Sequence, residues 1–192
     1  MDTKGSKTKH FICAEACKLF AQKGYKDVTM KDICDRTGLS RGGLYRHYGS
    51  TAEIFSEITE EFLNHQQNEF ADKIRNHVPA SEILEDILNR YETEMIDSEA
   101  SLSVAIYEFF SDPLRSKTDN SIRKQYLRSR EMWTELIAYG IETKEFKQTD
   151  PAAVYDLIVF SYQGVRMYSK LMEIEKEIPK RIMSQIRQLL LA

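Results

Sequence analysis

Hydrophobic residues recur along most of this chain with the spacing of an α-helix. One face of the first predicted helix carries four of them, Ile12, Ala16, Leu19 and Phe20. Gly24 follows this stripe and ends the helix, as a C-terminal glycine commonly does. Because the same periodicity returns almost everywhere further along, the pattern predicts an all-α protein.

Two short helices are predicted next, over residues 30–37 and 41–48. Thr29 can cap the first, with an acidic residue three positions later as a short variant of the capping box, and Gly38 ends it. Ser40 can cap the second. Two short helices joined by a tight turn are typical of a helix-turn-helix motif, whose second helix enters the major groove of DNA.

The second of these helices begins with two glycines, in the stretch "SRGGLYRHY" from Ser40 to Tyr48. A glycine inside a helix costs roughly 1 kcal/mol relative to alanine, so helix stability does not favour this composition. Without side chains at Gly42 and Gly43, however, the start of the helix can approach DNA closely. Its free N–H groups and positive dipole can also face phosphate.

Helical patterns continue through the remainder of the chain. Ser50 with Glu53 forms a capping box that opens a long helix to about residue 76. Further helices are predicted from near residue 81, over 102–110 and around 122–137.

The last two helices differ in character. Asp150 can cap the first of them, with Pro151 in its first turn, where proline is tolerated. Its apolar residues run almost all the way round, so it needs burial on two sides. We expect it to pair with the helix after Pro179 and with both copies in a second chain, as a four-helix bundle across a two-fold axis. The alternative is a pair of core helices in a monomer. The residues predicted at the dimer interface are Val154, Leu157, Ile158, Ser161, Val165, Tyr168, Ile182, Ile186 and Leu189.

The composition suits an ordered protein with a real core. The chain has 192 residues, of which 42% are hydrophobic and 10% aromatic, enough for one domain or two small ones. The first ten residues hold no apolar run like that of a signal peptide, and no segment approaches the roughly 20 apolar residues of a membrane span. We therefore expect a cytoplasmic protein with no membrane partner.

Charge is distributed unevenly along the chain. Residues 1–50 carry 10 Lys and Arg against 5 Asp and Glu, whereas residues 51–192 carry 17 against 25. A basic beginning joined to an acidic remainder suggests that the N-terminal part meets a polyanion, although many solvated helix faces have a similar charge.

The cysteines and histidines do not indicate a metal site. The three cysteines lack paired spacing, which fits a reducing compartment. Cys13 and Cys17 are four residues apart and could share a ligand, but the four histidines are scattered. We expect small, part-buried helix residues and neither metal nor cofactor.

Catalytic chemistry is also not indicated. His47 beside Tyr48, and the pairs Glu60-Glu61 and Glu92-Glu94, lack a third orienting group and lie on polar helix faces. The glycines of "RGG" follow no strand, so they are not a phosphate-binding loop. The sequence predicts no catalytic residue and no enzyme.

The run "GYKDVTMKDICDRTGLSRGGLYRHYGSTAEIF", residues 24–55, strongly resembles the DNA-binding module of the TetR (tetracycline-repressor) family. The stretch "YGIETKEFKQTDPAAVYDL" resembles the family only loosely. The resemblance implies an all-helical homodimer of about nine helices per chain. It implies a three-helix head with the helix-turn-helix over residues 1–50, including an arm over 1–9, and an effector-binding and dimerisation domain over 51–192.

The resemblance also implies a function. The family expectation is a transcriptional repressor that binds a pseudopalindromic double-stranded DNA operator and is released when a small molecule alters the spacing of its two heads. Base-edge contacts are implied for Arg41, Gly42 and Arg46, and arginine is the usual bidentate reader of guanine. The whole implied DNA-binding set is Thr29, Ser40, Arg41, Gly42, Gly43, Tyr45, Arg46, His47, Tyr48, Ser50 and Thr51.

Some parts of this surface are open to other interpretations. Tyr45 or Tyr48 could pack in the core of the head instead of contacting phosphate. Thr51 stands where many family members have a phosphate-binding lysine. Lysines of the arm (Lys4, Lys7 and Lys9) could compensate, or could belong to a disordered solubilising tail.

An effector would meet a surface rich in aromatic and sulfur atoms, which suits a hydrophobic or cationic compound. The same residues could be plain core, and the chain could be a DNA-binding dimer without an effector. We expect the pocket between the long helix after Ser50 and the later helices, with Glu94, Glu108 or Asp156 able to neutralise a cation. The predicted pocket residues are Tyr91, Met95, Tyr107, Phe110, Tyr126, Trp133 and Tyr162.

Overall fold

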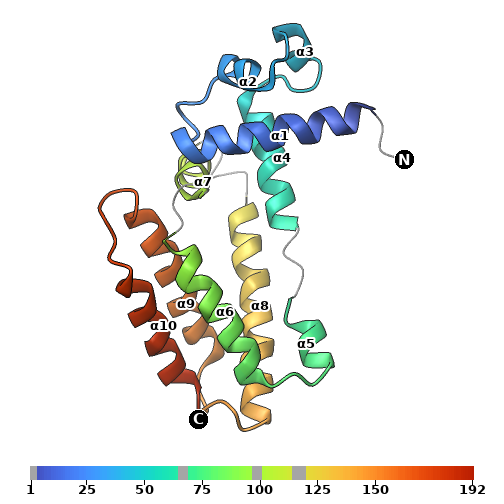
Figure 1. Cartoon of the computed structure of the whole chain (residues 1–192). Coiled ribbons are helices and arrows are strands. Elements are labelled where there is room, and N and C mark those ends of the chain that lie inside the picture. The colour runs from blue at the N-terminus through green and yellow to red at the C-terminus, as the bar shows by residue number, and fades with distance from the viewer. Residues whose placement is uncertain (1–3, 65–68, 97–100, 114–119) are drawn as a thin grey trace. The chain divides into compact units, whose positions relative to one another are not determined.

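The structure of the protein is a computed structural model that describes residues 4–64, 69–96, 101–113 and 120–192. These residues form ten α-helices (Figure 1), one more than the family resemblance implies. The all-helical fold predicted from the hydrophobic spacing is confirmed. By packing, the chain divides into two compact units, residues 1–65 with 99–119 and residues 66–98 with 120–192.

The first unit contains the helix-turn-helix. Its elements are α1 (Lys4–Lys23), α2 (Met30–Thr37), α3 (Arg41–Tyr45), α4 (Thr51–Asn64) and α7 (Ser103–Phe110). Helix α1 packs against α2, α4 and α7. The apolar stripe predicted for α1 is buried in the shared core, together with Ile33, Leu44, Phe55 and Phe109.

The caps predicted for this motif are present. Thr29 and Asp32 form a reciprocal capping box at α2, and Ser40 accepts the N–H of Gly43 at α3. Gly38 ends α2 with φ 71°, a left-handed conformation that glycine adopts without steric cost. These signals fix where α2 ends and α3 begins, so the turn between them follows from local chemistry.

Helix α3 is shorter than the predicted helix over 41–48. The N–H groups of His47 and Tyr48 both donate to the Leu44 carbonyl, at 2.9 and 3.1 Å, which closes a tighter last turn. The start of the chain, in contrast, is more helical than predicted. The predicted arm is helical from Lys4 onward, so Lys7 and Lys9 belong to α1, and residues 1–3 lie outside the described part.

The single long helix predicted from Ser50 to about residue 76 is wrong. The structure has α4 and a separate short α5 (Ala71–Arg75), with a turn at Glu69 and Phe70. Ile54 and Ile58 are buried in the core of the first unit, whereas Phe70 is buried in that of the second. Since α4 packs in the first unit, the division by packing also differs from the predicted boundary after residue 50.

The second unit is a helical bundle. It contains α5, α6 (Ala80–Glu94), α8 (Ser121–Glu142), α9 (Pro151–Tyr168) and α10 (Glu177–Leu190). Helix α6 contacts α8 and α10, and α9 contacts both of these as well. None of the helices among the described residues combines the length and the apolar character needed to span a bilayer.

Two carboxylates fix helix starts in this unit. Asp150 caps α9, as predicted, by accepting the N–H of Ala152 at 2.9 Å. Glu145 accepts the N–H groups of Ala80 and Ser81 at the start of α6, at 3.1 and 3.0 Å. Burial alone raises the pKa of Glu145, but these bonds and that from the Ser81 hydroxyl outweigh it and lower the pKa to about 2.

Helix α9 is apolar on two sides, but the structure corrects which side faces inward. The core of the second unit buries four residues that the sequence had placed at the dimer interface, Val154, Ile158, Val165 and Ile186. The other side leaves Leu157, Phe160 and Tyr168 exposed. Ser161 and Ile182 are half-buried, and Leu189 is exposed on α10. Sequence spacing alone could not choose the side, because neither carries a run of charges.

Candidate functional site

Helix α3 presents its polar residues outward because one residue holds it to the core. Leu44 is 0% exposed beneath the helix, while Arg41, Gly42, Tyr45 and Arg46 are exposed. The Arg41 guanidinium carbon lies 5.6 Å from the centre of the Tyr45 ring, within the range of a cation–π contact. The outer face of α3 therefore combines two arginines with an aromatic ring that bears a hydroxyl.

The two glycines of α3 are in different surroundings. A Cβ atom at Gly43 would lie 3.2 Å from the capping oxygen of Ser40, so the cap itself favours glycine there. At Gly42, a Cβ would meet nothing within 4 Å. The folded chain therefore does not require a glycine at position 42, and the space beside it is open to a molecule that approaches α3.

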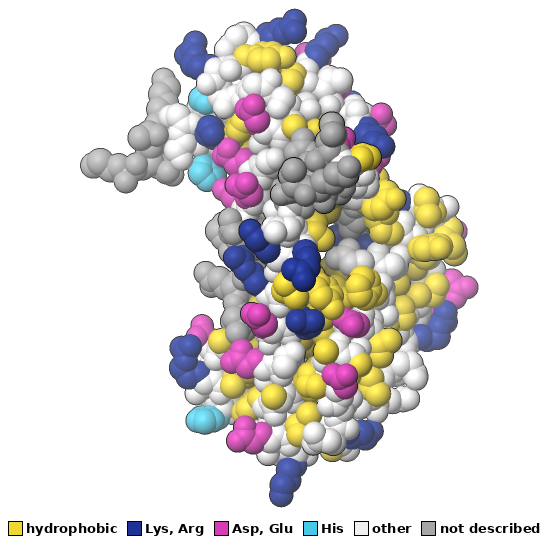
Figure 2. Space-filling model, turned by 180° about the vertical axis from the view of Figure 1, so that it is seen from behind, with side chains coloured by type: hydrophobic (Ala, Val, Ile, Leu, Met, Phe, Trp, Pro, Cys, Tyr) yellow, Lys and Arg dark blue, Asp and Glu magenta, His cyan; other side chains and the backbone are white. Residues whose placement is uncertain are grey.

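Several cations of the head are paired with carboxylates, whereas Arg41 of α3 and Arg46 directly after it are not, in the part of the chain that the structure describes. Lys18 and Arg36 pair with Glu15, and Lys23 pairs with Asp32. Neither Arg41 nor Arg46 forms an ion pair with any carboxylate in the described ranges. Figure 2 shows Lys and Arg side chains projecting at the end of the first unit formed by α2 and α3. Unpaired arginines on an exposed helix suit phosphate oxygens and guanine edges.

The hydroxyl groups around α3 are engaged within the head. Thr29 bonds to Asp32, whose pKa is held low by Lys23 and by Thr29 itself. Ser50 accepts the N–H of Glu53 at 3.2 Å, but the Glu53 carboxylate returns to the N–H of Gly49 at 2.8 Å, one residue earlier than in the predicted box. These residues set the path of the backbone near α3.

Tyr48 does not belong to the outer surface. Its side chain is 3% exposed and its hydroxyl lies 3.2 Å from the Cys13 sulfur, which ties the end of the α3 segment to α1. Burial raises the pKa of Tyr48, and the contact with Cys13 raises it further. The phosphate contact implied for Tyr48 is thus replaced by core packing. Tyr45, which is 44% exposed, keeps an accessible hydroxyl.

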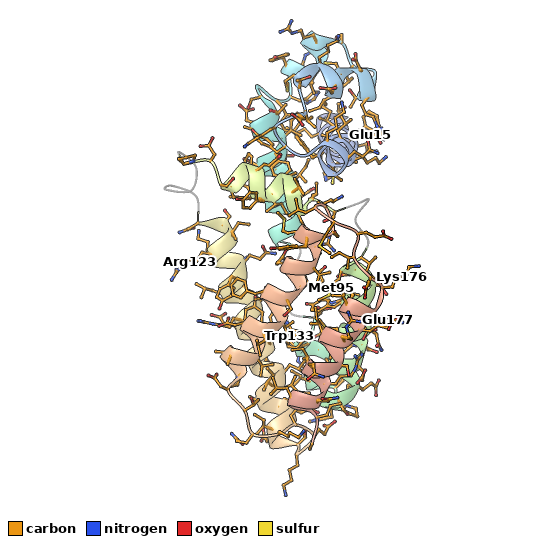
Figure 3. The ribbon with its side chains drawn as sticks, turned by 90° about the vertical axis from the view of Figure 1, so that its left-hand side faces the viewer. Glu15, Met95, Arg123, Trp133, Lys176 and Glu177 are labelled. Atoms are coloured by element: carbon orange, nitrogen blue, oxygen red, sulfur yellow. The ribbon has the colours of Figure 1, made fainter. Side chains whose placement is uncertain are left out.

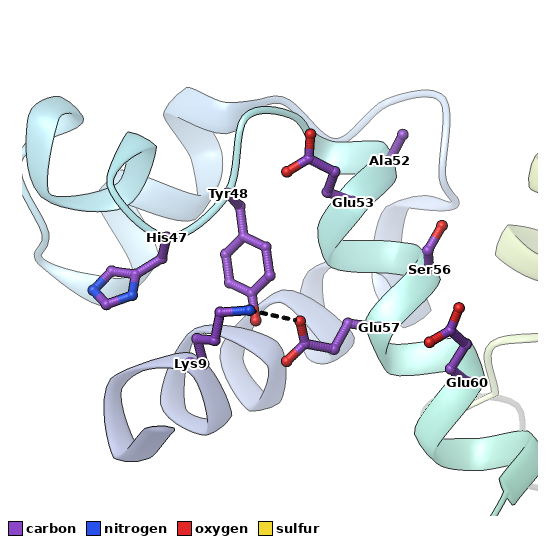
Figure 4. A pocket seen from close by; sticks show the side chains of 8 residues that line it. All are labelled: Lys9, His47, Tyr48, Ala52, Glu53, Ser56, Glu57 and Glu60. Atoms are coloured by element: carbon purple, nitrogen blue, oxygen red, sulfur yellow. Dashed lines mark hydrogen bonds and ion pairs between the residues drawn. The ribbon is translucent and has the colours of Figure 1, made fainter. Parts of the chain in front are cut away.

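A surface hollow of about 600 Å³ lies beside Tyr48 (Figure 4). Lys9 crosses it, 3.1 Å from Glu57 and 4.7 Å from the centre of the Tyr48 ring. His47 lines this hollow and is half-buried. Three carboxylates make its wall acidic, and no three potential ligands among the described residues are placed to hold a metal ion. Its residues come from α1, the α3 segment and α4, so sequence spacing gave no signal for it.

The predicted pocket residues fall into two groups. Tyr91, Trp133 and Tyr162 gather in the second unit, with ring centres 4.7 Å apart for Tyr91–Tyr162 and 6.4 Å for Tyr91–Trp133. Met95 and Trp133 are buried within its core (Figure 3). Tyr126 is in the same unit, 5.3 Å from the ring of Tyr155. We name Tyr91, Trp133 and Tyr162 the aromatic cluster.

The remaining two pocket residues lie on α7, in the first unit. Tyr107 is exposed there. The ring centre of Phe110 lies 5.0 Å from that of Phe109, at the edge of that unit's core. Helix α7 follows α6 directly in the chain, so its sequence position gave no sign that it packs in a different core.

Polar groups border the aromatic cluster. The Tyr162 hydroxyl donates to the Glu94 carboxylate at 2.9 Å, and Arg166 donates to that hydroxyl at 3.0 Å and to the Glu94 carbonyl at 2.5 Å. Burial raises the pKa of Tyr91 and of Tyr162, so both phenols stay neutral. Sequence reasoning missed Arg166, although it lies one helical turn after Tyr162.

Of the other two carboxylates considered for a cation, Asp156 accepts the Tyr126 hydroxyl. Glu108 lies in the first unit, where it bonds to the backbone after α1. Of the three, only Glu94 borders the aromatic cluster.

Comparison with known families and proteins matches both units. The model of the bacterial regulatory proteins, tetR family, matches residues 12–58, and that of the tetracyclin repressor-like C-terminal domain matches residues 83–178. The uncharacterized HTH-type transcriptional regulator YfiR of Bacillus subtilis is 31% identical over 145 residues, which cover 72% of this chain and 68% of YfiR.

Two further proteins extend the comparison. The HTH-type transcriptional repressor KstR2 of Mycobacterium tuberculosis is 28% identical over 145 residues, which cover 74% of this chain and 72% of KstR2. A crystal structure of a putative transcriptional regulator from Saccharomonospora viridis in complex with choline has the same fold. Its TM-score is 0.78, at 16% identity, with 97% of this chain and 99% of that one covered.

The open space at Gly42 yields a prediction that separates folding from DNA binding. Gly42→Ala should stabilise the head by roughly 0.5–1 kcal/mol, because alanine is the better helix former and its methyl group meets no atom. It should weaken binding to specific DNA by about tenfold, or ~1.4 kcal/mol, because that methyl group occupies the approach path of the duplex. Urea denaturation and fluorescence anisotropy with labelled DNA measure the two effects.

Gly43→Ala serves as the control, since its methyl group would crowd Ser40 and should lower stability as well. Unchanged DNA affinity in Gly42→Ala would refute the role given to this glycine.

Proposed function

This chain belongs to the TetR family of bacterial transcriptional regulators, and we propose that it is a repressor that binds a pseudopalindromic operator as a homodimer and leaves it when a small molecule binds. The expectation of a regulator rather than an enzyme is confirmed by this membership. The observation that carries the proposal is the exposed, unpaired pair Arg41 and Arg46 on a helix anchored by Leu44. Its site of action is the cytoplasm, with the operator DNA.

DNA recognition follows from the outer face of α3. With α3 in the major groove, Arg41 and Arg46 donate to guanine O6 and N7, and Gly42 allows the backbone close to the base edges. Tyr45 and Ser40 face phosphate oxygens, as do the backbone N–H groups that follow Ser50 at the start of α4. In this arrangement Tyr48, Thr29 and Glu53 stabilise the backbone around α3, and the residues next to them contact the DNA.

The dimer forms through the outer side of α9. Phe160, which is 66% exposed, and its neighbours on this side repeat every three or four residues, and Figure 2 shows hydrophobic side chains gathered on one face of the second unit. A Cβ atom at Gly164 would meet nothing within 4 Å, so a partner helix can approach closely there. The proposed stripe is Leu157, Phe160, Gly164, Tyr168 and Leu171, with Leu189 beside it on α10.

The effector is a cationic compound held by the aromatic cluster. The rings of Tyr91 and Tyr162 attract cations, since guanidinium carbons of the protein already lie 5.8 and 5.3 Å from their centres, and Glu94 supplies a negative charge beside them. A cationic effector would take the place of these guanidinium groups. The choline in the structurally similar regulator from Saccharomonospora viridis supports this class of ligand. The alternative, a DNA-binding dimer without an effector, is favoured by the fact that Glu94 is already bonded to Tyr162.

Removing the arginines tests DNA recognition. Arg41→Ala and Arg46→Ala should each cost roughly 1–3 kcal/mol of discrimination for the operator, because each removes a bidentate base contact. Gel shifts with the upstream region of the protein's own gene, against competitor DNA of random sequence, measure this. Arg123→Ala, an exposed arginine on α8, is the control and should bind as the parent does. If both α3 variants bind specific sites like the parent, the assignment of the recognition helix fails.

Charging the α9 stripe tests the dimer. Phe160→Glu places a carboxylate in the proposed interface and should convert the dimer to monomers at micromolar concentration, since an unpaired charge there is desolvated. Sedimentation velocity measures the change. Ile122→Glu, at another exposed hydrophobic residue, should leave the dimer intact. A monomeric parent protein, or a dimeric Phe160→Glu variant, would contradict the interface.

A thermal-shift comparison tests the effector class. Choline at 100 times its dissociation constant should stabilise the protein by about 2.7 kcal/mol through mass action. Its neutral isostere 3,3-dimethylbutanol should do much less, because only a cation gains from the ring faces and Glu94. Glu94→Gln should weaken choline binding while keeping the bond to Tyr162. Equal shifts with the two compounds would indicate a hydrophobic site, and no shift with either would favour a dimer without this effector.

A further inference from the structure

Helix α7 belongs to different parts of the molecule by sequence and by packing. Along the chain it lies between α6 and α8, which carry Tyr91, Glu94 and Trp133 of the second unit. By packing it belongs to the first unit, where it contacts α1. The side chains of α7 therefore act directly on the DNA-binding head.

One side chain of α7 holds the backbone of the DNA-binding head. A single oxygen of Glu108, Oε2, accepts the N–H of Tyr25 at 2.7 Å and the N–H of Lys26 at 3.0 Å. These two N–H groups follow the end of α1 and lie outside its regular hydrogen-bonded turns. Charge-assisted bonds to two consecutive N–H groups are strong and directional, so Glu108 fixes the turn between α1 and α2.

The turn is built around this carboxylate. Gly24 has φ 80°, which side chains other than glycine's disfavour, and a Cβ atom there would lie 2.7 Å from Glu108 Oε2. The glycine thus provides both the conformation and the space for the carboxylate. Loss of either the glycine or the carboxylate should leave the turn without its defined geometry.

Aromatic packing holds α7 against the turn that follows α1. Phe109, the neighbour of Glu108, is buried with its ring centre 4.8 Å from that of Tyr25 and 4.8 Å from that of Phe55. The turn leads directly to Thr29, which caps α2, and α2 leads to α3. The direction in which the turn leaves α1 therefore sets where the recognition helix begins.

We propose that Glu108 is a positioning residue for DNA binding, which fixes the turn between α1 and α2 and with it the start of the recognition helix. Its carboxylate holds the turn at Tyr25 and Lys26 in the DNA-binding conformation. The inference rests on the proposed function and adds a residue that positions the recognition helix without touching DNA. Glu108 touches no DNA in this account and acts through the backbone of the turn.

Variants of Glu108 test the inference. Glu108→Ala should bind the operator about tenfold more weakly, with nearly unchanged affinity for random DNA, because the helix-turn-helix remains folded but is misplaced. Glu108→Gln, which keeps one neutral acceptor, should be intermediate. Glu60→Ala removes an exposed carboxylate of α4 and should bind like the parent. Fluorescence anisotropy gives the affinities, and circular dichroism checks that each variant is folded.

A coupled pair of substitutions sharpens this test. Gly24→Ala alone should weaken operator binding, because its methyl group meets the carboxylate. In the double variant with Glu108→Ala, the loss of operator-binding free energy should be smaller than the sum of the losses in the two single variants, because the clash with the carboxylate is gone. Full additivity would show that the glycine and the carboxylate act independently and would overturn the inference.

Amide hydrogen exchange in the parent protein tests the coupling itself. If the turn conformation and DNA binding are linked, operator DNA must slow exchange at Tyr25 and Lys26, by at least about tenfold, and Glu108→Ala must abolish this slowing. The Gly24 N–H, which bonds to the Phe20 carbonyl, reports any simple shielding by DNA. A purely structural Glu108 would leave the two rates unaffected by DNA.

The outcomes separate this inference from the proposed function. If the parent protein binds no operator, the proposed function fails and this inference fails with it. If the parent binds but Glu108→Ala binds equally well, or exchange at Tyr25 and Lys26 ignores the operator, only the role of Glu108 is refuted.

Discussion

The proposed DNA-reading surface depends on the burial of one side chain, Leu44. A helix of five residues such as α3 is not stable by itself in water, because too few bonds repay its nucleation. Leu44 enters the core with Ile33 and Phe55, and the Ser40 cap begins the helix at a defined residue. Because these two restraints hold α3 in place, its exposed residues Arg41, Gly42 and Tyr45 remain available for the proposed contacts with DNA.

The ion pairs of the head also differ between α3 and the helices that support it. Within the described ranges, several lysines and arginines of α1 and α2 are paired with carboxylates, while Arg41 and Arg46 are left open. In the second unit, the two sides of α9 also have different roles. One side of α9 completes the core and the other stays apolar and exposed, while the aromatic cluster borders Glu94.

The features set by local chemistry could be predicted from the sequence, and those set by tertiary packing could not. The caps at Thr29, Ser40 and Asp150 and the left-handed glycines depend on a few neighbouring residues, so their signals are readable. The inward side of α9 and the partners of α7 depend on which core receives them, and spacing carries no such information. Phe70 illustrates the limit, because it continues the apolar register of α4 and yet packs beyond a break, against Trp133. The sequence likewise could not decide whether Tyr48 contacts phosphate or packs in the core, because its burial depends on contacts with α1.

The central claim is that α3 enters the major groove and reads guanine through two arginines, once per subunit. Dimethyl sulfate footprinting of the operator measures this most directly, since the reagent methylates guanine N7 in the major groove and adenine N3 in the minor groove. The account predicts two clusters of protected guanines related by a two-fold axis, with centres one helical turn or a multiple of it apart. Protection confined to adenines of the minor groove, or a single cluster without a symmetric counterpart, would contradict it.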